Sequence, residues 1–132
     1  MDPEQLAGLP LFADLDDDQR AEVAACTREV TVEPGTTVLA QGDNAYEFFV
    51  IVSGDAEVHK DGEIVTRVGK GDVVGEIGLL VTGARTASIV AVTPMTLIAI
   101  FSRDFKRIKD RMPAVAESLR STMRERVART SL

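Results

Sequence analysis

The sequence contains one cysteine and one histidine, and both scarcities exclude kinds of chemistry. Cys26 cannot form an internal disulfide, and its apolar neighbours predict a buried core thiol rather than a nucleophile. A metal-dependent enzyme needs clustered imidazole and carboxylate ligands, whereas His59 is the only imidazole in the chain. We therefore expect no metal site and no enzymatic activity, and we expect His59 to be an outward-facing strand residue beside Lys60.

Long hydrophobic runs and basic stretches are scarce as well. No apolar run is longer than that of residues 48–52, whereas a membrane-spanning helix needs roughly 20 apolar residues. The acidic N-terminus lacks the basic flank of a signal peptide. The net charge of −6 repels phosphate backbones, and no basic stripe follows the expected strands. We therefore expect a soluble, cytoplasmic protein with no membrane segment and no direct binding to nucleic acid.

The composition and the turn signals predict one β-rich domain over residues 1–132. A chain of 132 residues that is 45% hydrophobic has the size for one domain with one core. Runs of β-branched and aromatic residues, such as 47–52 and 87–92, lie between regularly spaced turns. This spacing predicts an antiparallel sandwich or jelly roll of about eight strands within residues 27–101. The turn signals lie at residues 34–35, 42–44, 53–55, 61–62, 69–72, 83 and 93–94.

Helices are predicted before and after the strands in the sequence, in residues 1–26 and 102–132. The acids at residues 16–18 suit a helix start, because they accept hydrogen bonds from free amides and complement the helix dipole. Ser102 is the predicted N-cap of a helix that ends near Met112, because the proline that follows disfavours helical geometry there.

The last predicted helix begins at Pro113, which suits a first helical turn. Its arginines stand near Glu117 and Glu125, and we expect them to form a solvated face with some ion pairs. Apolar residues recur at every fourth position, which predicts a stripe that covers another part of the protein. The stripe consists of Val115, Leu119, Met123 and Val127, and the arginines are Arg120, Arg124, Arg126 and Arg129.

Residues 75–88 carry the chemistry of this chain. Gly75 permits a tight turn, and Glu76 then stands at the first turn of a short predicted helix, residues 77–81. The free amides of a helix start attract a phosphate, and the Arg85 guanidinium supplies paired donors for its oxygens. A carboxylate such as Glu76 suits a sugar hydroxyl instead, so the ligand would carry phosphate and ribose. The spacing alone equally allows Glu76 and Arg85 to pair with each other across a loop.

Residues 71–79, followed by residues 85–87, resemble the phosphate-binding cassette of the cyclic nucleotide-binding domain family. The resemblance covers residues 9–132 and places the shared glycines where turns are predicted. It implies a mainly β fold, an eight-stranded β-roll (jelly roll) with N-terminal helices and two C-terminal helices. Further matching positions, in the order of the family, are Leu11-Phe12, Gly35, Gln41-Gly42-Asp43, Ile51 with Ser53-Gly54, and Phe105 followed by Pro113.

The resemblance implies a role for each part of the cassette, residues 75–87. Arg85 and the amides around Ala84 and Thr86 would hold the cyclic phosphate. Glu76 and the amide of Gly75 would hold the ribose 2′-hydroxyl. Family cassettes often carry proline just before the arginine, and Ala84 in that position leaves the loop less rigid. The expected ligand-binding residues are Gly75, Glu76, Ile77, Gly78, Ala84, Arg85, Thr86 and Ala87.

Three features could close the pocket over the base, and the sequence does not choose among them. Thr86 can bond the phosphate or a guanine amino group, and threonine here favours cyclic GMP in kinases that respond to it. The last helix resembles the dimerising helix of bacterial catabolite activator proteins, which places Thr130 and Ser131 where that family has a Thr-Ser pair against adenine. Arg120 and Arg124 could instead stack on the base.

The favoured interpretation is a regulatory module that senses a cyclic nucleotide, cyclic AMP (cAMP) ahead of cyclic GMP (cGMP), and signals through its C-terminal helix. The expected partners are that nucleotide, an effector domain or protein not visible in this chain, and a second copy of the chain that pairs through the same helix. No helix-turn-helix follows the last predicted helix in this sequence, which ends at Leu132. The alternative is a nucleotide-free β-roll that serves protein–protein interaction.

Overall fold

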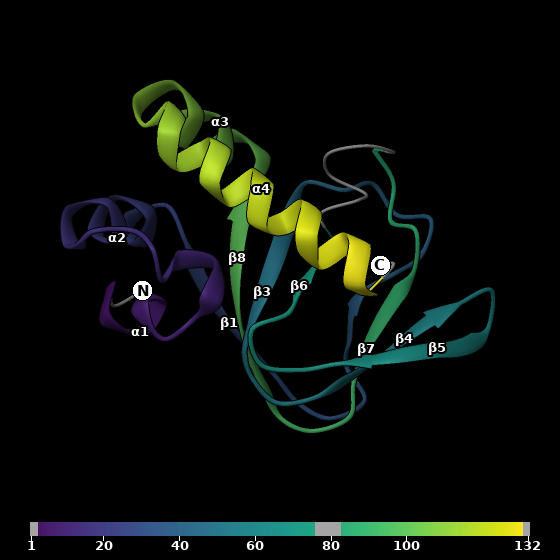
Figure 1. Ribbon diagram of the computed structural model, residues 1–132. Coiled ribbons are helices and arrows are strands. Elements are labelled where there is room, and N and C mark those ends of the chain that lie inside the picture. The colour runs from purple at the N-terminus through teal and green to yellow at the C-terminus, as the bar shows by residue number, and fades with distance from the viewer. Residues whose placement is uncertain (1–2, 76–82, 131–132) are drawn as a thin grey trace.

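The protein is described here by a computed structural model, in which residues 3–75 and 83–130 are placed (Figure 1). Within these residues, three short helical segments precede eight strands and two helices follow them, in the order that the sequence predicts. The elements are α1 (Pro3–Ala7), the 3-10 helix η1 (Pro10–Phe12), α2 (Asp17–Ala25), β1 (Arg28–Val32), β2 (Thr37–Leu39), β3 (Glu47–Ser53), β4 (Ala56–Lys60), β5 (Glu63–Val68), β6 (Val73–Val74), β7 (Ser88–Ala91), β8 (Met95–Phe101), α3 (Ser102–Arg111) and α4 (Pro113–Thr130).

The strands form two four-stranded antiparallel sheets, in the orders β1-β8-β3-β6 and β2-β7-β4-β5. This arrangement confirms the predicted β-roll. The longest pairing joins β3 to β8, from Glu47 opposite Phe101 to Ser53 opposite Thr96. In Figure 1 the helices gather at one end of the roll, and the β4–β5 hairpin projects away from them.

Strand β3 supplies two separate apolar clusters, one on each face of its sheet. Successive side chains of a strand point to opposite faces. Phe48 and Val50 pack with the helices, whereas Phe49 and Ile51 point into the interior of the roll. All four are buried, so β3 appears in the sequence as a continuous apolar run. Where one core was expected, the protein has a helix-side cluster and a roll-interior cluster that share the strands β3, β6 and β8.

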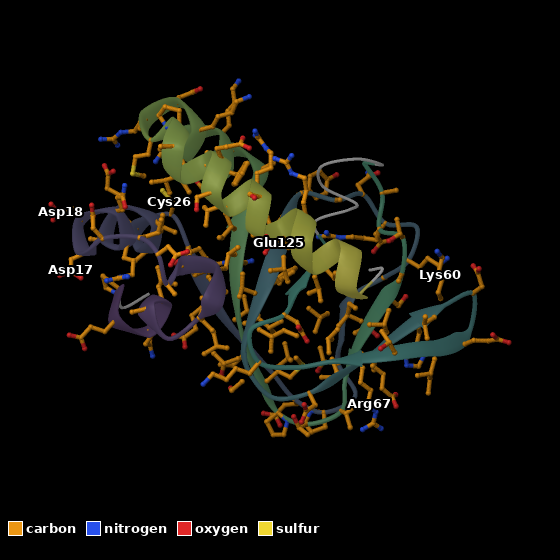
Figure 2. All side chains as sticks on the ribbon, viewed as in Figure 1. Asp17, Asp18, Cys26, Lys60, Arg67 and Glu125 are labelled. Carbon is orange, nitrogen blue, oxygen red and sulfur yellow. The ribbon has the colours of Figure 1, made fainter. Side chains whose placement is uncertain are left out.

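The N-terminal helices form part of the helix-side cluster. The predicted start of α2 is confirmed, because Asp16 caps it and Gln19 donates and accepts the two reciprocal bonds of a capping box. Cys26 is half-buried rather than buried, because α2 ends at Ala25 and Cys26 occupies the C-cap position at the edge of the cluster. Figure 2 shows Cys26 among the helices, far from Lys60 and Arg67 on the β4–β5 hairpin.

The predicted cap of α3 is wrong. Strand β8 continues to Phe101, which is the N-cap residue and makes no side-chain cap bond, and Ser102 is the first residue of the helix. The backbone amide of Ser102 donates to the carbonyl oxygen of Tyr46 at 2.9 Å, so a distant segment replaces the cap. The helix ends before Met112, as predicted.

Helix α4 begins at Pro113, which confirms the predicted start, and its first half packs onto the protein. Val115 and Leu119 of the predicted stripe are buried in the helix-side cluster with Leu11 and Phe12. The side chains of the other two stripe residues, at positions 123 and 127, lie outside those described. Among the described residues, no helix is long and apolar enough to cross a membrane.

Candidate functional site

Arg85 is the only buried charged or polar side chain in the described part of the chain, with 7% of its surface exposed. Its Nη1 donates to the carbonyl oxygen of Glu47 at 2.7 Å and to that of Gly75 at 3.1 Å. A charge removed from water is costly unless hydrogen bonds and an opposite charge compensate it. The two hydrogen bonds to carbonyl oxygens hold the guanidinium in place.

The loop before β3 holds the backbone around Arg85. The amide of Arg85 donates to the carbonyl of Asp43 at 2.8 Å, and the carbonyl of Arg85 accepts from the amide of Gly42 at 2.9 Å. Two residues after Asp43, the amide of Ala45 donates to the carbonyl of Gly83 at 3.0 Å. These bonds join segments that are distant in sequence, so the position of Arg85 depends on tertiary pairing rather than on its own segment.

Gly75 is required at this site for two reasons. Its φ of +86° lies in the left-handed region, which a residue with a side chain adopts only with strain. A Cβ atom at this position would also lie 2.6 Å from Nη1 of Arg85. The turn signal in the sequence therefore marks a close approach between backbone and guanidinium as well as a bend.

A hollow of about 420 Å³ opens beside Arg85. Its walls come from the end of β2, including Leu39, and from the loop before β3, including Asn44 and Tyr46. The Asn44 amide nitrogen donates to the Tyr46 hydroxyl at 3.3 Å. Arg85 is thus one of the residues that line a space open to solvent, together with further polar residues.

The remaining predicted cassette residues fall into two groups. Ala84, Thr86 and Ala87 flank Arg85 and are half-buried, and Ala84 is bridged to Asn44 by antiparallel backbone pairing. Glu76, Ile77 and Gly78 lie outside the described residues, together with the whole of the predicted helix 77–81.

The predicted base-capping arginines form ion pairs on α4. Arg120 Nη1 and Arg124 Nη2 lie 3.3 Å and 3.0 Å from the two carboxylate oxygens of Glu117. The Arg120 guanidinium also lies over the ring of Phe105, 5.8 Å from its centroid. The solvated face with ion pairs that the sequence predicts is therefore confirmed for these residues. The side chain of Thr130 and all of Ser131 lie outside the described residues.

Glu47 is the site residue that sequence reasoning missed. Its carbonyl accepts the hydrogen bond from Arg85, and its carboxylate Oε2 lies 3.6 Å from Nη2 of Arg28. The available signal was an acid directly before the apolar run of β3, where the strand begins. Such an acid is easily read as an exposed strand end, but the Glu47 side chain is only 20% exposed.

The histidine lies away from Arg85, on the β4 strand. His59 is half-buried, and its Nε2 lies 3.3 Å from the carboxylate of Glu57. Among the described residues, no group of three or more histidine, cysteine, aspartate or glutamate side chains could hold a metal ion.

Comparison with known proteins identifies the family. The sequence profile of the cyclic nucleotide-binding domain family matches residues 29–112, which is most of the chain and includes Arg85 and its carbonyl partners. This chain belongs to the cyclic nucleotide-binding domain family, whose members are regulatory domains.

Individual relatives agree with this assignment. The chain is 33% identical over 105 residues to a cAMP-dependent protein kinase regulatory subunit from Yarrowia lipolytica, covering 78% of this chain and 28% of the relative. It is 34% identical to the N-terminal domain of a transcriptional regulator from Streptomyces coelicolor, with a TM-score of 0.77, covering 96% and 94% of the two chains. A protein described as cyclic nucleotide-binding, from Geobacter metallireducens, shares the fold with a TM-score of 0.87 at 20% identity, covering 100% and 99%. The chain spans about a quarter of the length of its curated kinase relatives.

Proposed function

We propose that this chain is a sensor of cAMP and that Arg85 binds the cyclic phosphate. The observation that carries the proposal is the burial of Arg85, held by two carbonyl oxygens beside an open hollow. A guanidinium presents parallel donors that match two phosphate oxygens, and a buried guanidinium forms such charge-assisted bonds away from the screening of water.

The rest of the cassette would complete the ligand shell. We assign the ribose 2′-hydroxyl to Glu76 and the amide of Gly75, and the phosphate to Arg85 with the amides around Ala84 and Thr86. These assignments rest on the family resemblance of the sequence. The proposed ligand-binding set is Gly75, Glu76, Ile77, Gly78, Ala84, Arg85, Thr86 and Ala87.

Two observations bear on the choice of base. The Yarrowia relative and a second curated relative are regulatory subunits of cAMP-dependent kinases, which favours cAMP. Thr86 is half-buried next to Arg85, so its hydroxyl could serve the phosphate or a guanine amino group, and cGMP is the second candidate. The base cap is assigned to α4, through Arg120, Arg124, Thr130 or Ser131.

The signal would leave the domain through the C-terminal helices. Helix α4 packs its first half into the helix-side cluster, which shares β3 with the roll interior. A ligand-dependent change at β3 could therefore reach α4 through packed side chains. The proposed receivers are an effector domain or protein and a second copy of this chain that pairs through α4.

Calorimetric titration with cAMP and with cGMP tests the proposal, with adenosine 5′-monophosphate as the control. The control keeps the base and the sugar but carries a phosphate that is not tied to the 3′-oxygen. We expect binding of cAMP, weaker binding of cGMP and weaker binding still of the control. Absence of heat with both cyclic nucleotides would overturn the proposal and favour a nucleotide-free domain that serves protein contacts.

A further inference from the structure

We propose that Glu47 is a positioning residue for Arg85, and that it couples the Arg85 guanidinium to the start of helix α3. This inference rests on the proposed function, because the coupling matters only if Arg85 binds a ligand. It concerns residues outside the cassette, namely Glu47 at the start of β3 and its ion-pair partner Arg28 on β1.

Two successive carbonyl groups at the start of β3 serve two different parts of the protein. The carbonyl oxygen of Tyr46 accepts from the amide of Ser102, the first residue of α3, at 2.9 Å. The carbonyl oxygen of Glu47 accepts from Nη1 of Arg85 at 2.7 Å. The two carbonyl groups belong to adjacent peptide units that meet at the Cα atom of Glu47, so a displacement of this Cα atom moves both acceptors. The start of β3 thus links the candidate site directly to the first turn of α3.

The carboxylate of Glu47 depends on Arg28. Its Oε2 is buried and accepts no hydrogen bond from any described residue, and the Arg28 guanidinium lies 3.6 Å away. A buried carboxylate oxygen without such a bond is costly, so the nearby positive charge is needed to keep it in place. Arg28 therefore holds the side chain of Glu47, whose Cα atom joins the peptide units that carry the two carbonyl groups.

Arg28 also contacts the residue that precedes α3. Its guanidinium lies over the ring of Phe101, 5.3 Å from the centroid, and Arg103 of α3 lies over the same ring at 5.5 Å. Phe101 is the register partner of Glu47 across the β3–β8 pair. Backbone and side-chain contacts therefore converge on the same junction between the roll and the C-terminal helices. Coupling between two sites is reciprocal, so occupancy of Arg85 and the geometry of α3 should bias each other.

The test compares cAMP affinity and amide exchange in Glu47→Gln, Arg28→Gln and the double variant. Each single variant should weaken cAMP binding by about threefold to tenfold, as residues along a coupling network do. The double variant should be no weaker than the worse single variant, because both remove the same ion pair. Added cAMP should slow exchange of the Ser102 amide in the original protein and slow it less in the variants.

Glu57→Gln is the matched control. Glu57 pairs with Arg67 at 3.4 Å, and the exposures of that pair, 22% and 67%, are close to the 20% and 60% of Glu47 and Arg28. Figure 2 shows Arg67 at the β4–β5 hairpin, on the far side of the roll from α3. The control should lose a comparable ion pair while its cAMP affinity stays within about twofold of the original.

The outcomes separate this inference from the proposed function. If the original protein does not bind cAMP, the proposed function fails. If it binds and both single variants retain the original affinity and the original Ser102 protection, the positioning role is wrong while the proposed function stands. Should Glu47→Gln fail to fold, Arg28→Gln decides alone, because the Arg28 side chain is 60% exposed and belongs to neither apolar cluster.

Discussion

Two arginines of this protein, Arg85 and Arg124, occupy contrasting environments. Arg85 lies in the roll, is 7% exposed and donates to two backbone carbonyls. Arg124 lies on α4 with its side chain 65% exposed and pairs with Glu117, whose side chain is 62% exposed. The first is held by distant parts of the fold, whereas the second pairs with an acid of its own helix.

The difference indicates what each arginine can do. An exposed pair gains little, because water and salt screen it and two flexible side chains must be ordered. A buried, pre-positioned guanidinium has already lost its hydration, so a phosphate that reaches it gains a strong charge-assisted bond without further ordering. The site therefore depends on the buried arginine, and the exposed ones should have a smaller effect.

The largest expected effect is the loss of Arg85. Arg85→Leu should weaken cAMP binding by about 2–5 kcal/mol, the usual cost of removing one partner of a desolvated charge pair. Isothermal titration measures the loss, and the control is Arg67→Leu on β5, an arginine whose side chain is 67% exposed and which pairs with Glu57; its affinity should stay within about threefold of the original. Equal losses of cAMP affinity in Arg85→Leu and in the control would show that the burial of Arg85 does not distinguish its role in binding from that of an exposed arginine.

The stabilisation of the folded protein by cAMP should also depend on the buried arginine and not on an exposed one. A ligand at about one hundred times its dissociation constant adds about 2.7 kcal/mol to the free energy of unfolding, if it binds only the folded state. For a chain of this size, the midpoint of thermal unfolding should rise by roughly 10 °C with cAMP. Arg67→Leu should keep this shift and Arg85→Leu should lose it at the same ligand concentration. A shift that survives in Arg85→Leu would place the phosphate elsewhere.

A glycine pair can separate backbone strain from contact with Arg85. Gly75 and Gly35 have the same φ of +86°, but an added Cβ meets Nη1 of Arg85 at 2.6 Å only at Gly75, and meets nothing within 4 Å at Gly35. Alanine at either position should lower the free energy of unfolding by about 1–3 kcal/mol through strain. Chemical denaturation measures this loss, and titration should show weakened cAMP binding in Gly75→Ala alone. If Gly75→Ala binds cAMP with the original affinity, then displacing the Arg85 guanidinium does not affect binding, and its position is not important for the ligand.

The smallest expected effect concerns α4. Glu117→Gln removes the carboxylate that pairs with Arg120 and Arg124, and should change the free energy of unfolding by about 0.2–1 kcal/mol. Urea denaturation at low and high salt measures the change, which should shrink as salt screens the pairs. An effect above about 2 kcal/mol would show that the α4 arginines are more strongly coupled than their exposure indicates.

Much of the fold was predictable because the signals are local. The acids before α2 act through bonds within one helical turn, and Pro113 acts on its immediate neighbours. The strand-rich middle of the chain was predictable from the spacing of the turn signals. Gly75 is one such turn residue, and its φ is positive in the structure. The two clusters were not predictable, because a strand buried on both faces, such as β3, shows no alternation of polar and apolar residues.

The errors and omissions come from long-range contacts. Ser102 has the residue type of an N-cap, but β8 continues to Phe101 and the carbonyl of Tyr46 takes the Ser102 amide. Nothing in the sequence distinguishes Arg85 from Arg124 by burial, because burial depends on the loop before β3 and on Glu47. The resemblance singled out Arg85, and only the tertiary structure gives its partners.

The most direct test of the central claim observes the Arg85 side chain by NMR during a titration. Arginine Nε–H resonances report on hydrogen bonding, and the Arg85→Leu spectrum identifies the Arg85 signal by its absence. Addition of cAMP should shift this signal, while adenosine, which lacks the phosphate, should leave it unchanged. The signal of the exposed Arg67 should move little with either ligand. If cAMP binds and the Arg85 signal stays where it was, then Arg85 is not the phosphate ligand.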